Sequence, residues 1–111
     1  MEKNELILLE TVLGCTRNGN GFQEKEETAQ TEVFCAVKSA GRKEFYDAER
    51  SGYKASTIFV VDHDDFETAA RDVAGKKVRA SRVVYNNVRY LIHRTYVKEY
   101  GDMELTCEEV E

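Results

Sequence analysis

The residues best suited to nucleophilic chemistry are the cysteines, of which the 111-residue chain has three. A cysteine nucleophile needs a nearby histidine base, and the available pair is Cys35 with His63 or His93. Cys35, however, lies in an apolar run from Val33 to Val37, where a thiol is usually inert. The cysteines are widely spaced and include no Cys-x-x-Cys pair, which excludes a zinc ribbon. We interpret them as small buried or half-buried thiols.

Metal and nucleotide chemistry have equally little support. The segment Asp62-His63-Asp64-Asp65 holds metal-ligand residue types, but it lacks the glycine and the spaced acids of a calcium-binding loop. We expect this segment to form a solvated turn. Gly19 and Gly21 occur without the third glycine of a dinucleotide fingerprint, and no nucleophile elbow or paired-histidine motif is present. The sequence thus predicts no catalytic residue, no metal site and no cofactor.

The size and composition set the frame in which any site must be built. A chain of 111 residues with 41% hydrophobic residues has enough apolar surface for one modest core. We therefore expect a single domain over residues 1–111. No apolar run approaches the roughly 20 residues of a membrane span, and the run from Leu6 to Leu9 is too short for a signal-peptide core. These features predict a soluble protein made in the cytoplasm, without a membrane partner.

The net charge of −5 is distributed unevenly along the chain. Residues 76–98 hold seven bases and no acid, whereas residues 99–111 hold six acids and no base. Cross-strand charge pairing within one sheet would explain the two bands. A surface with two electrostatic poles that docks head-to-tail with copies of itself would explain them as well. The two interpretations are compatible, and the sequence leaves both open.

The hydrophobic pattern along the N-terminal two thirds indicates mainly strands. A first strand from Leu6 to Leu13 is expected to end at Gly14, and the turn formers from Arg17 to Gly21 follow it. Residues 22–29 suit an exposed strand or a flexible arm, and residues 31–38 alternate as a strand that is at least partly covered on both sides. The period then changes, which predicts one short helix at about residues 42–51, with Gly52 as its left-handed end. Residues 57–61 return to strand. Residues 66–74 could form a strand end, a loop or one helical turn, and their acids and Gly75 favour a loop.

The C-terminal third has the clearest pattern. Strands at residues 81–85 and 88–96 flank Asn86-Asn87, a two-residue hairpin loop. This register places Tyr85 opposite Val88 and Val83 opposite Tyr90, with the large residues on one face. In the last strand, Met103, Leu105 and Cys107 alternate with Glu104, Thr106 and Glu108. Arg89 and His93 are then expected to lie beside the outer carboxylates Glu104 and Glu108.

These elements predict a mainly β fold, a small antiparallel β-barrel with one short helix and a long loop. The chain has no proline, which often blunts edge strands. We therefore expect that the barrel closes or that its edges pair with a partner. A small barrel could also bind single-stranded oligonucleotides by stacking on aromatic side chains. Against this alternative, Tyr85 and Tyr90 point to the predicted core face, and the chain is acidic overall.

The order of the segments resembles a known family. The segments that carry the resemblance are Glu32-Val33-Phe34-Cys35-Ala36-Val37-Lys38-Ser39, Gly41-Arg42-Lys43-Glu44-Phe45-Tyr46-Asp47-Ala48, Val84-Tyr85-Asn86-Asn87-Val88-Arg89-Tyr90-Leu91-Ile92-His93-Arg94-Thr95-Tyr96 and Met103-Glu104-Leu105-Thr106-Cys107-Glu108-Glu109. Together they resemble the head-tail joining, or head-closure, proteins of long-tailed bacteriophages and prophages. The likeness covers about residues 5–110. The family's usual glycine in the last hairpin turn is replaced by Asn87.

The resemblance implies a function that the composition does not show. Members of this family are small β-barrels without enzymatic activity that assemble as a ring of subunits beneath the portal and its adaptor. The subunit ring closes the DNA channel, and tail proteins dock on it. Double-stranded DNA passes without sequence-specific binding. The resemblance further implies that residues 39–55 face the channel or a neighbouring subunit, while the isolated protein is often monomeric. The residues expected to make contacts, from this segment and from the basic band, are Arg42, Lys43, Phe45, Tyr46, Arg50, Tyr53, Arg82, Arg89 and Arg94.

Overall fold

The computed structural model describes residues 3–17, 24–39, 50, 52, 56–98 and 101–110. Strands make up most of this part of the chain, so the prediction of a mainly β fold is confirmed. In chain order, the elements are β1 (Glu5–Arg17), β2 (Glu24–Ser39), β3 (Thr57–Asp62), α2 (His63–Thr68), β4 (Arg71–Val73), β5 (Lys76–Val78), β6 (Arg82–Tyr85), β7 (Val88–Val97) and β8 (Asp102–Val110).

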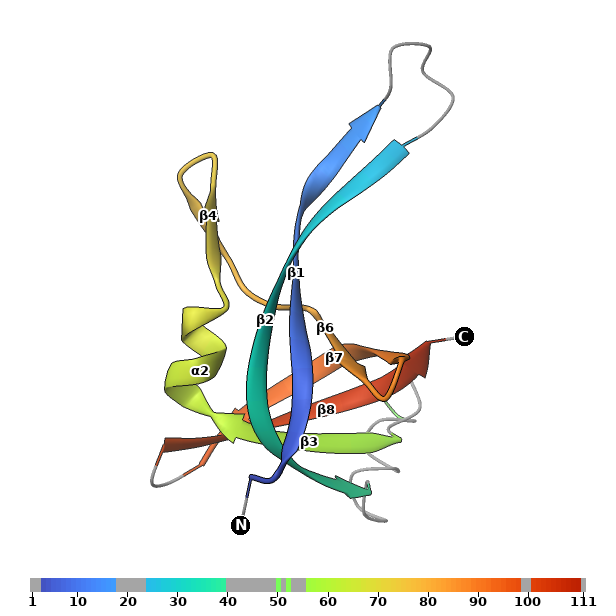
Figure 1. Cartoon of the computed structure of the whole chain (residues 1–111), viewed down its shortest axis with the longest axis vertical. Helices are drawn as coiled ribbons and strands as arrows, with labels where there is room; N and C mark the ends of the chain where they lie inside the picture. The colour runs from blue at the N-terminus through green and yellow to red at the C-terminus, as the bar shows by residue number, and fades with distance from the viewer. Residues whose placement is uncertain are drawn as a thin grey trace.

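Six of the strands form one closed antiparallel sheet. Their order is β1-β2-β3-β8-β7-β6, and β6 pairs back onto β1. The strands β4 and β5 form a separate two-stranded sheet. Figure 1 shows β1 and β2 crossing in front of the other strands of the closed sheet and continuing beyond it as a two-stranded ribbon. We call this ribbon, residues 11–17 of β1 with residues 24–30 of β2, the arm.

The core lies inside the closed sheet because successive side chains of a strand point to opposite faces. Each strand contributes its inward-facing alternate residues, such as Leu9 from β1 and Leu105 from β8, which are both fully buried. Phe59 of β3 is central and is also fully buried. Its ring meets Tyr85 and Tyr90 edge to face, with ring centroids 5.7 and 5.1 Å apart. The predicted inward orientation of these two tyrosines is therefore confirmed.

The β6–β7 hairpin has the predicted register. Tyr85 pairs with Val88, and Val83 pairs with Tyr90. The loop residues Asn86 and Asn87 have φ angles of 50° and 64°. Positive φ at both loop positions matches the right-handed twist of the flanking strands, and asparagine adopts it at small cost. The local sequence is therefore enough to predict the register of this hairpin.

The first strand is longer than predicted. Gly14 does not end it: β1 continues to Arg17, which pairs with Glu24, and the register shifts between Val12 and Gly14. A bulge at this point admits an extra residue without ending the pairing, which explains why the glycine is tolerated. Of the two interpretations offered for residues 22–29, an extended strand is found from Glu24 onward. Of the predicted turn formers from Arg17 to Gly21, all but Arg17 lie outside the described residues.

The turn predicted at Asp62–Asp65 and the loop favoured over residues 66–74 are wrong, because helix α2 extends to Thr68 and strand β4 begins at Arg71. Asp62 is the N-cap residue of helix α2, and Asp64 and Asp65 lie in its first turn, where the helix dipole favours acidic side chains. Phe66 anchors the helix, because only 2% of its surface is exposed. Residues 71–78 form the β4–β5 hairpin, whose turn residues Ala74 and Gly75 both have positive φ.

Most of the helix predicted at residues 42–51 lies outside the described residues. Within it, Arg50 is described and has helical backbone geometry. Gly52 has a φ of 91°, the left-handed conformation expected just after a helix end. The candidate contact residues Arg42, Lys43, Phe45, Tyr46 and Tyr53 also lie outside the described part of the chain.

Candidate interaction surfaces

Two arginines of the basic band converge on one buried carboxylate at the base of the arm. Only 2% of Glu10 on β1 is exposed. Its Oε1 lies 3.1 Å from Nη1 of Arg82, its cross-strand partner on β6. Its Oε2 lies 3.5 Å from Nη2 of Arg89 on β7 and accepts a hydrogen bond of 3.1 Å from Nε2 of Gln30 on β2. This cluster joins four strands through one carboxylate.

Arg82 also ties the arm to the closed sheet. Its guanidinium donates two hydrogen bonds to the carboxylate of Glu26 on β2, at 2.6 and 2.9 Å. Charge-assisted bidentate pairs of this kind fix geometry as well as adding energy. The hydrogen bonds to Glu26 and then to Glu10 raise the pKa of Arg82, while the hydrogen bond from Arg82 holds the pKa of Glu26 below its ordinary value. Both side chains are therefore charged at neutral pH, and the arm is held in a defined direction.

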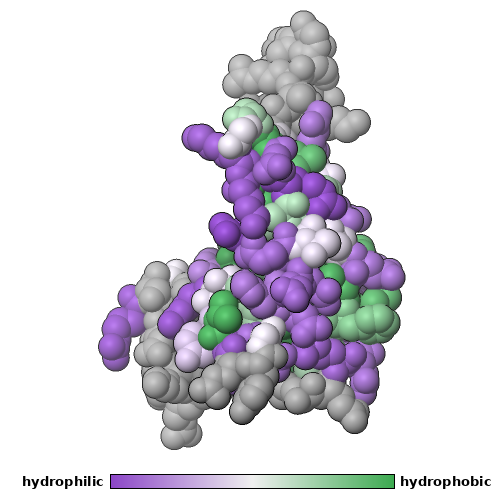
Figure 2. Space-filling view, turned by 90° about the vertical axis from the view of Figure 1, so that its left-hand side faces the viewer, coloured by the Kyte–Doolittle hydropathy of each residue, from purple (hydrophilic) through white to green (hydrophobic). Residues whose placement is uncertain are grey.

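The helix α2 and the β4–β5 hairpin also pack against β1 and β2. The hydroxyl of Thr11 donates a buried hydrogen bond of 2.9 Å to the carbonyl of Ala69. The guanidinium of Arg71 donates to the carbonyls of Thr68 and Ala70, both at 3.0 Å, and to Oγ1 of Thr31 at 3.3 Å. The face of the molecule that carries α2 and this hairpin is mainly hydrophilic, as Figure 2 shows, with hydrophobic residues gathered near its right-hand edge.

The charge bands pair largely with partners other than those expected. Lys77 and Arg79 bind Glu67 of α2, and Arg82 and Arg89 bind Glu10. The prediction that Arg89 lies beside a carboxylate of the last strand is therefore wrong, because Arg89 pairs with Val110 of β8 and its guanidinium contacts Glu10 of β1. The prediction for His93 is confirmed: its Nε2 lies 3.0 Å from Oε1 of Glu108. Cross-strand pairing is thus real, while the docking alternative stays a proposal.

Three ion-paired carboxylates, Glu67, Asp102 and Glu104, have lowered pKa values, which predicts that the folded protein loses stability in acid. Hydrogen bonds from Lys77 and Arg79 lower the pKa of Glu67 from 4.5, and that from Lys3 lowers the pKa of Asp102 from 3.8. For Glu104, burial raises the pKa, but hydrogen bonds from Lys38 and Lys98 more than offset it. Because the folded pKa lies below the unfolded value, each pair stabilises fully above the unfolded pKa and is lost as the pH falls through the folded one.

We therefore expect the free energy of unfolding to decrease as the pH is lowered from about 5 toward 3. Urea unfolding at a series of pH values measures this slope. Glu67→Gln removes one of the titrating groups and should make the slope shallower. A free energy of unfolding that is constant or rises over this range would contradict the expectation.

Arg94 is placed apart from Arg82 and Arg89. It lies after the bulge in β7, opposite Thr106 of β8, and its side chain is exposed. Among the described residues, it has no ion pair. It borders a shallow hollow of about 420 Å³, whose lining includes Phe66 of α2 and Met103 of β8. Of the three candidate arginines in the basic band, the structure thus brings Arg82 and Arg89 together on Glu10 and leaves Arg94 apart from them.

Sequence reasoning missed an apolar surface on the outer face of β1, β2 and β6. Leu6 and Phe34 are cross-strand partners, and 44% and 59% of their surfaces are exposed. Leu8 and Val84, another pair of partners, lie beside them and line a hollow of about 220 Å³. The run from Leu6 to Leu9 was a usable signal, because an unbroken apolar run supplies apolar side chains to both faces of a strand.

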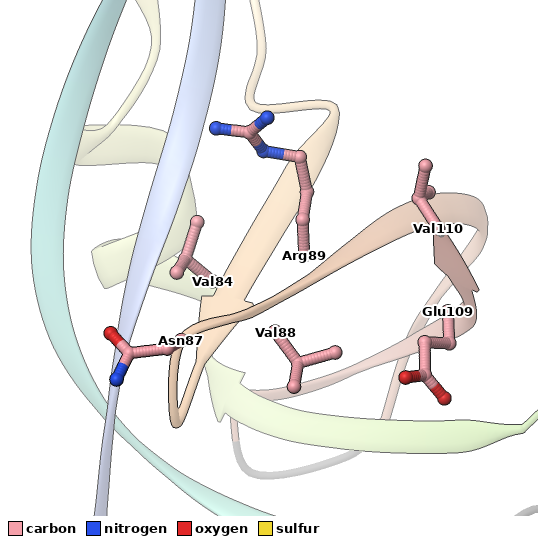
Figure 3. A pocket seen from close by; sticks show the side chains of 6 residues that line it. All are labelled: Val84, Asn87, Val88, Arg89, Glu109 and Val110. Carbon is pink, nitrogen blue, oxygen red and sulfur yellow. The ribbon is translucent and has the colours of Figure 1, made fainter.

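A second hollow adjoins this surface near the β6–β7 turn. Its volume is about 410 Å³, and it shares Val84 and Asn87 with the first hollow. Figure 3 shows that its apolar side chains come from three strands, whereas the guanidinium of Arg89 extends toward β1. It is lined by Val84, Asn87, Val88, Arg89, Glu109 and Val110. The two hollows make this side of the closed sheet a broad shallow surface, of a kind that suits contact with another protein.

The residues singled out for nucleophilic or metal chemistry do not form a site in the described part of the chain. Burial raises the pKa of the Cys35 thiol to about 11, with a further contribution from Glu5, and that of Cys107 to about 12. Both thiols are therefore protonated at neutral pH. The described residues contain no cluster of three or more metal-ligating side chains. No described helix has the length and hydropathy of a transmembrane segment.

Comparison with known proteins agrees with the resemblance drawn from the sequence motifs. A search of curated proteins returned no match to the chain. The family model described as phage head completion protein matches residues 4–110. This match covers all the strands that the structure describes, including the long β1–β2 hairpin and the β6–β7 hairpin. The resemblance to phage head-closure proteins is confirmed, and the chain belongs to the phage head completion protein family.

Proposed function

We propose that the protein is a structural connector of a tailed phage or prophage particle. In this proposal, copies of the chain form a subunit ring beneath the portal and its adaptor, close the DNA channel after packaging and provide the surface on which the tail docks. The observation that carries the proposal is the match to the phage head completion family over residues 4–110. Membership of this family supports a structural role at the head-tail junction. The ring of subunits is our proposal beyond that membership.

The described surface supports a contact role. Its hollows are shallow and are lined by strand side chains, and the buried thiols are protonated. The proposed partners are further copies of this chain, portal or adaptor proteins, and tail proteins. In this proposal the protein itself has no catalytic role. Arg82 and Arg89 are engaged by Glu10, and the chain carries a net charge of −5. Such a protein would let double-stranded DNA pass rather than hold it, since nonspecific DNA binding needs a basic surface.

The proposed channel-facing part is the segment at residues 39–55. The proposal takes this placement from the family resemblance, and the segment includes the candidate contact residues Arg42, Lys43, Phe45, Tyr46, Arg50 and Tyr53. The closed sheet, which fits the small antiparallel β-barrel expected for the family, would form the body that carries this segment.

Deletion of the gene from the phage or prophage that carries it tests the proposal. We expect packaged heads to lose their DNA and to fail to join tails, and a plasmid copy of the gene should restore infectious particles. Stable filled heads that join tails normally would overturn the proposal. If filled heads were stable but tails were defective, the protein would instead complete the tail side of the same junction.

An oligonucleotide-binding role is the alternative from a different class. Stacking on bases needs exposed aromatic rings, but the rings of Tyr85 and Tyr90 pack edge to face on the buried Phe59. The described structure therefore gives this alternative little support. Salt-dependent binding of a single-stranded oligonucleotide by the purified protein would revive it.

A further inference from the structure

Two exposed outer faces of the closed sheet carry matching pairs of side chains. On β2, Glu32 and Phe34 are two residues apart on the outer face, because the residues between and beside them, Val33 and Cys35, are buried inward. On β7, Arg94 and Tyr96 are likewise two residues apart, and they pair with the outward-facing Thr106 and Glu104 of β8. Each pair thus presents a charge and an aromatic ring at the same spacing, with opposite charges on the two faces.

Both pairs are solvent-exposed in the isolated chain. Phe34 is 59% exposed and Tyr96 is 63% exposed, the largest values among the exposed apolar or aromatic residues of the described chain. Glu32 and Arg94 are exposed and have no ion pair among the described residues. The β2 face also has an apolar neighbour at its rim, because Leu6 is the cross-strand partner of Phe34 and is 44% exposed. Large exposed apolar side chains grouped with unpaired charges are typical of protein contact surfaces.

The two faces lie on strands that are not neighbours in the closed sheet. In the order β1-β2-β3-β8-β7-β6, two strands separate β2 from β7 in either direction. Figure 1 shows β2 in front of the closed sheet and β7 behind it. A subunit with two different, complementary faces associates head-to-tail, which builds a ring or a filament and not a closed symmetric dimer.

We propose that the β2 face of one copy, formed by Glu32, Phe34 and Leu6, docks on the β7 face of the next copy, formed by Arg94 and Tyr96. The proposal rests on the proposed function, because it names the contact by which the subunit ring closes. The partner is a second copy of this chain, since each face presents an aromatic ring and, at the same spacing, a charge opposite to that of the other face.

The charges around both faces are consistent with this pairing. Near the β7 face, Lys98 accompanies Arg94, and its Nζ lies 3.0 Å from Oε2 of Glu104. Two bases against one carboxylate leave an excess of positive charge there, which Glu32 of the incoming copy would oppose. Two copies of the β2 face would instead bring two Glu32 carboxylates together, which disfavours self-pairing. The complementary arrangement therefore selects head-to-tail contacts.

Cross-linking with a short bismaleimide tests the contact directly. The variant with both Glu32→Cys and Arg94→Cys should give a ladder of covalent multiples of the 12.7-kDa chain in assembled particles. Each single-cysteine variant should give no ladder, and at most a cross-linked pair of chains. These variants also show how much cross-linking comes from the native cysteines. Tailed, infectious particles that carry the double variant without any ladder would overturn the contact while leaving the proposed function intact.

Charge reversal provides an independent test of specificity. In cells that lack the chromosomal gene, Glu32→Arg or Arg94→Glu alone should lower the titre of infectious particles by about tenfold or more, because each places like charges together. The double reversal should recover most of this loss. Unchanged titres for the single variants, or a double variant as defective as the singles, would overturn the contact. Failure of the wild-type gene to restore any titre would instead count against the proposed function.

Discussion

Replacing Phe59 with alanine is expected to lower the free energy of unfolding by about 3–5 kcal/mol, the range typical of a large core aromatic. Phe59 is fully buried inside the closed sheet. The substitution would leave a cavity against the Tyr85 and Tyr90 rings, which now meet it edge to face at 5.7 and 5.1 Å. Equilibrium urea denaturation followed by tyrosine fluorescence and circular dichroism would measure the change.

Phe34→Ala is the matched control because it removes the same side chain from an exposed position. With 59% of Phe34 exposed, we expect a change within about 0.5 kcal/mol. If Phe59→Ala does not fold, Phe59→Leu keeps part of the core volume and should fold with a smaller loss. Equal effects for Phe59→Ala and Phe34→Ala would contradict the placement of Phe59 at the centre of the core.

Replacing Arg82 with methionine is expected to lower the free energy of unfolding by about 3 kcal/mol, because it leaves a buried carboxylate without its cross-strand partner. Only 2% of Glu10 is exposed, and Oε1 of Glu10 then loses the guanidinium that lies 3.1 Å away. The same change also removes the two hydrogen bonds to Glu26 that hold the arm. Thermal and urea unfolding would both record the loss.

Arg94→Met is the matched control on a neighbouring strand, since Arg94 is exposed and has no ion pair among the described residues. Its effect should stay within about 0.5 kcal/mol. Adding Glu10→Gln to Arg82→Met should recover part of the stability, because an amide costs less to bury than an unpaired charge. Equal losses for the two arginine variants, or no recovery in the double variant, would show that Glu10 does not depend on Arg82.

The parts of the fold that follow from local pattern could be predicted from the sequence. The β6–β7 hairpin needs only alternation and a two-residue loop, and its register was predicted correctly through Tyr85–Val88 and Val83–Tyr90. The inward face of β8 follows from the alternation of Met103, Leu105 and Cys107. In both cases, the residues that decide the structure lie within a few positions of each other.

The parts that depend on distant partners could not be predicted. Glu10 lies in an alternating strand as an apparently exposed glutamate, and the arginine that accounts for its burial is 72 residues away. Helix α2 has only six residues, most of them polar, so its sequence resembles a polar turn. The burial of Phe66 that stabilises the helix depends on distant parts of the chain. The outer apolar surface is a tertiary feature too, because Leu8 and Val84 become neighbours only when β6 pairs with β1.

The open edges of the arm have a consequence for the behaviour of the chain at high concentration. In the described residues, β2 pairs with β3 only through residues 36–39, and β1 pairs with β6 only through residues 8–10. The arm therefore presents long stretches of free backbone donors and acceptors, to which strands of other molecules can add indiscriminately. Glu26 and Glu27 stand on this stretch, and Glu32 lies near its base. In a chain without proline, the charges of Glu27 and Glu32 oppose the stacking of one arm on another, because such stacking would bring like charges together.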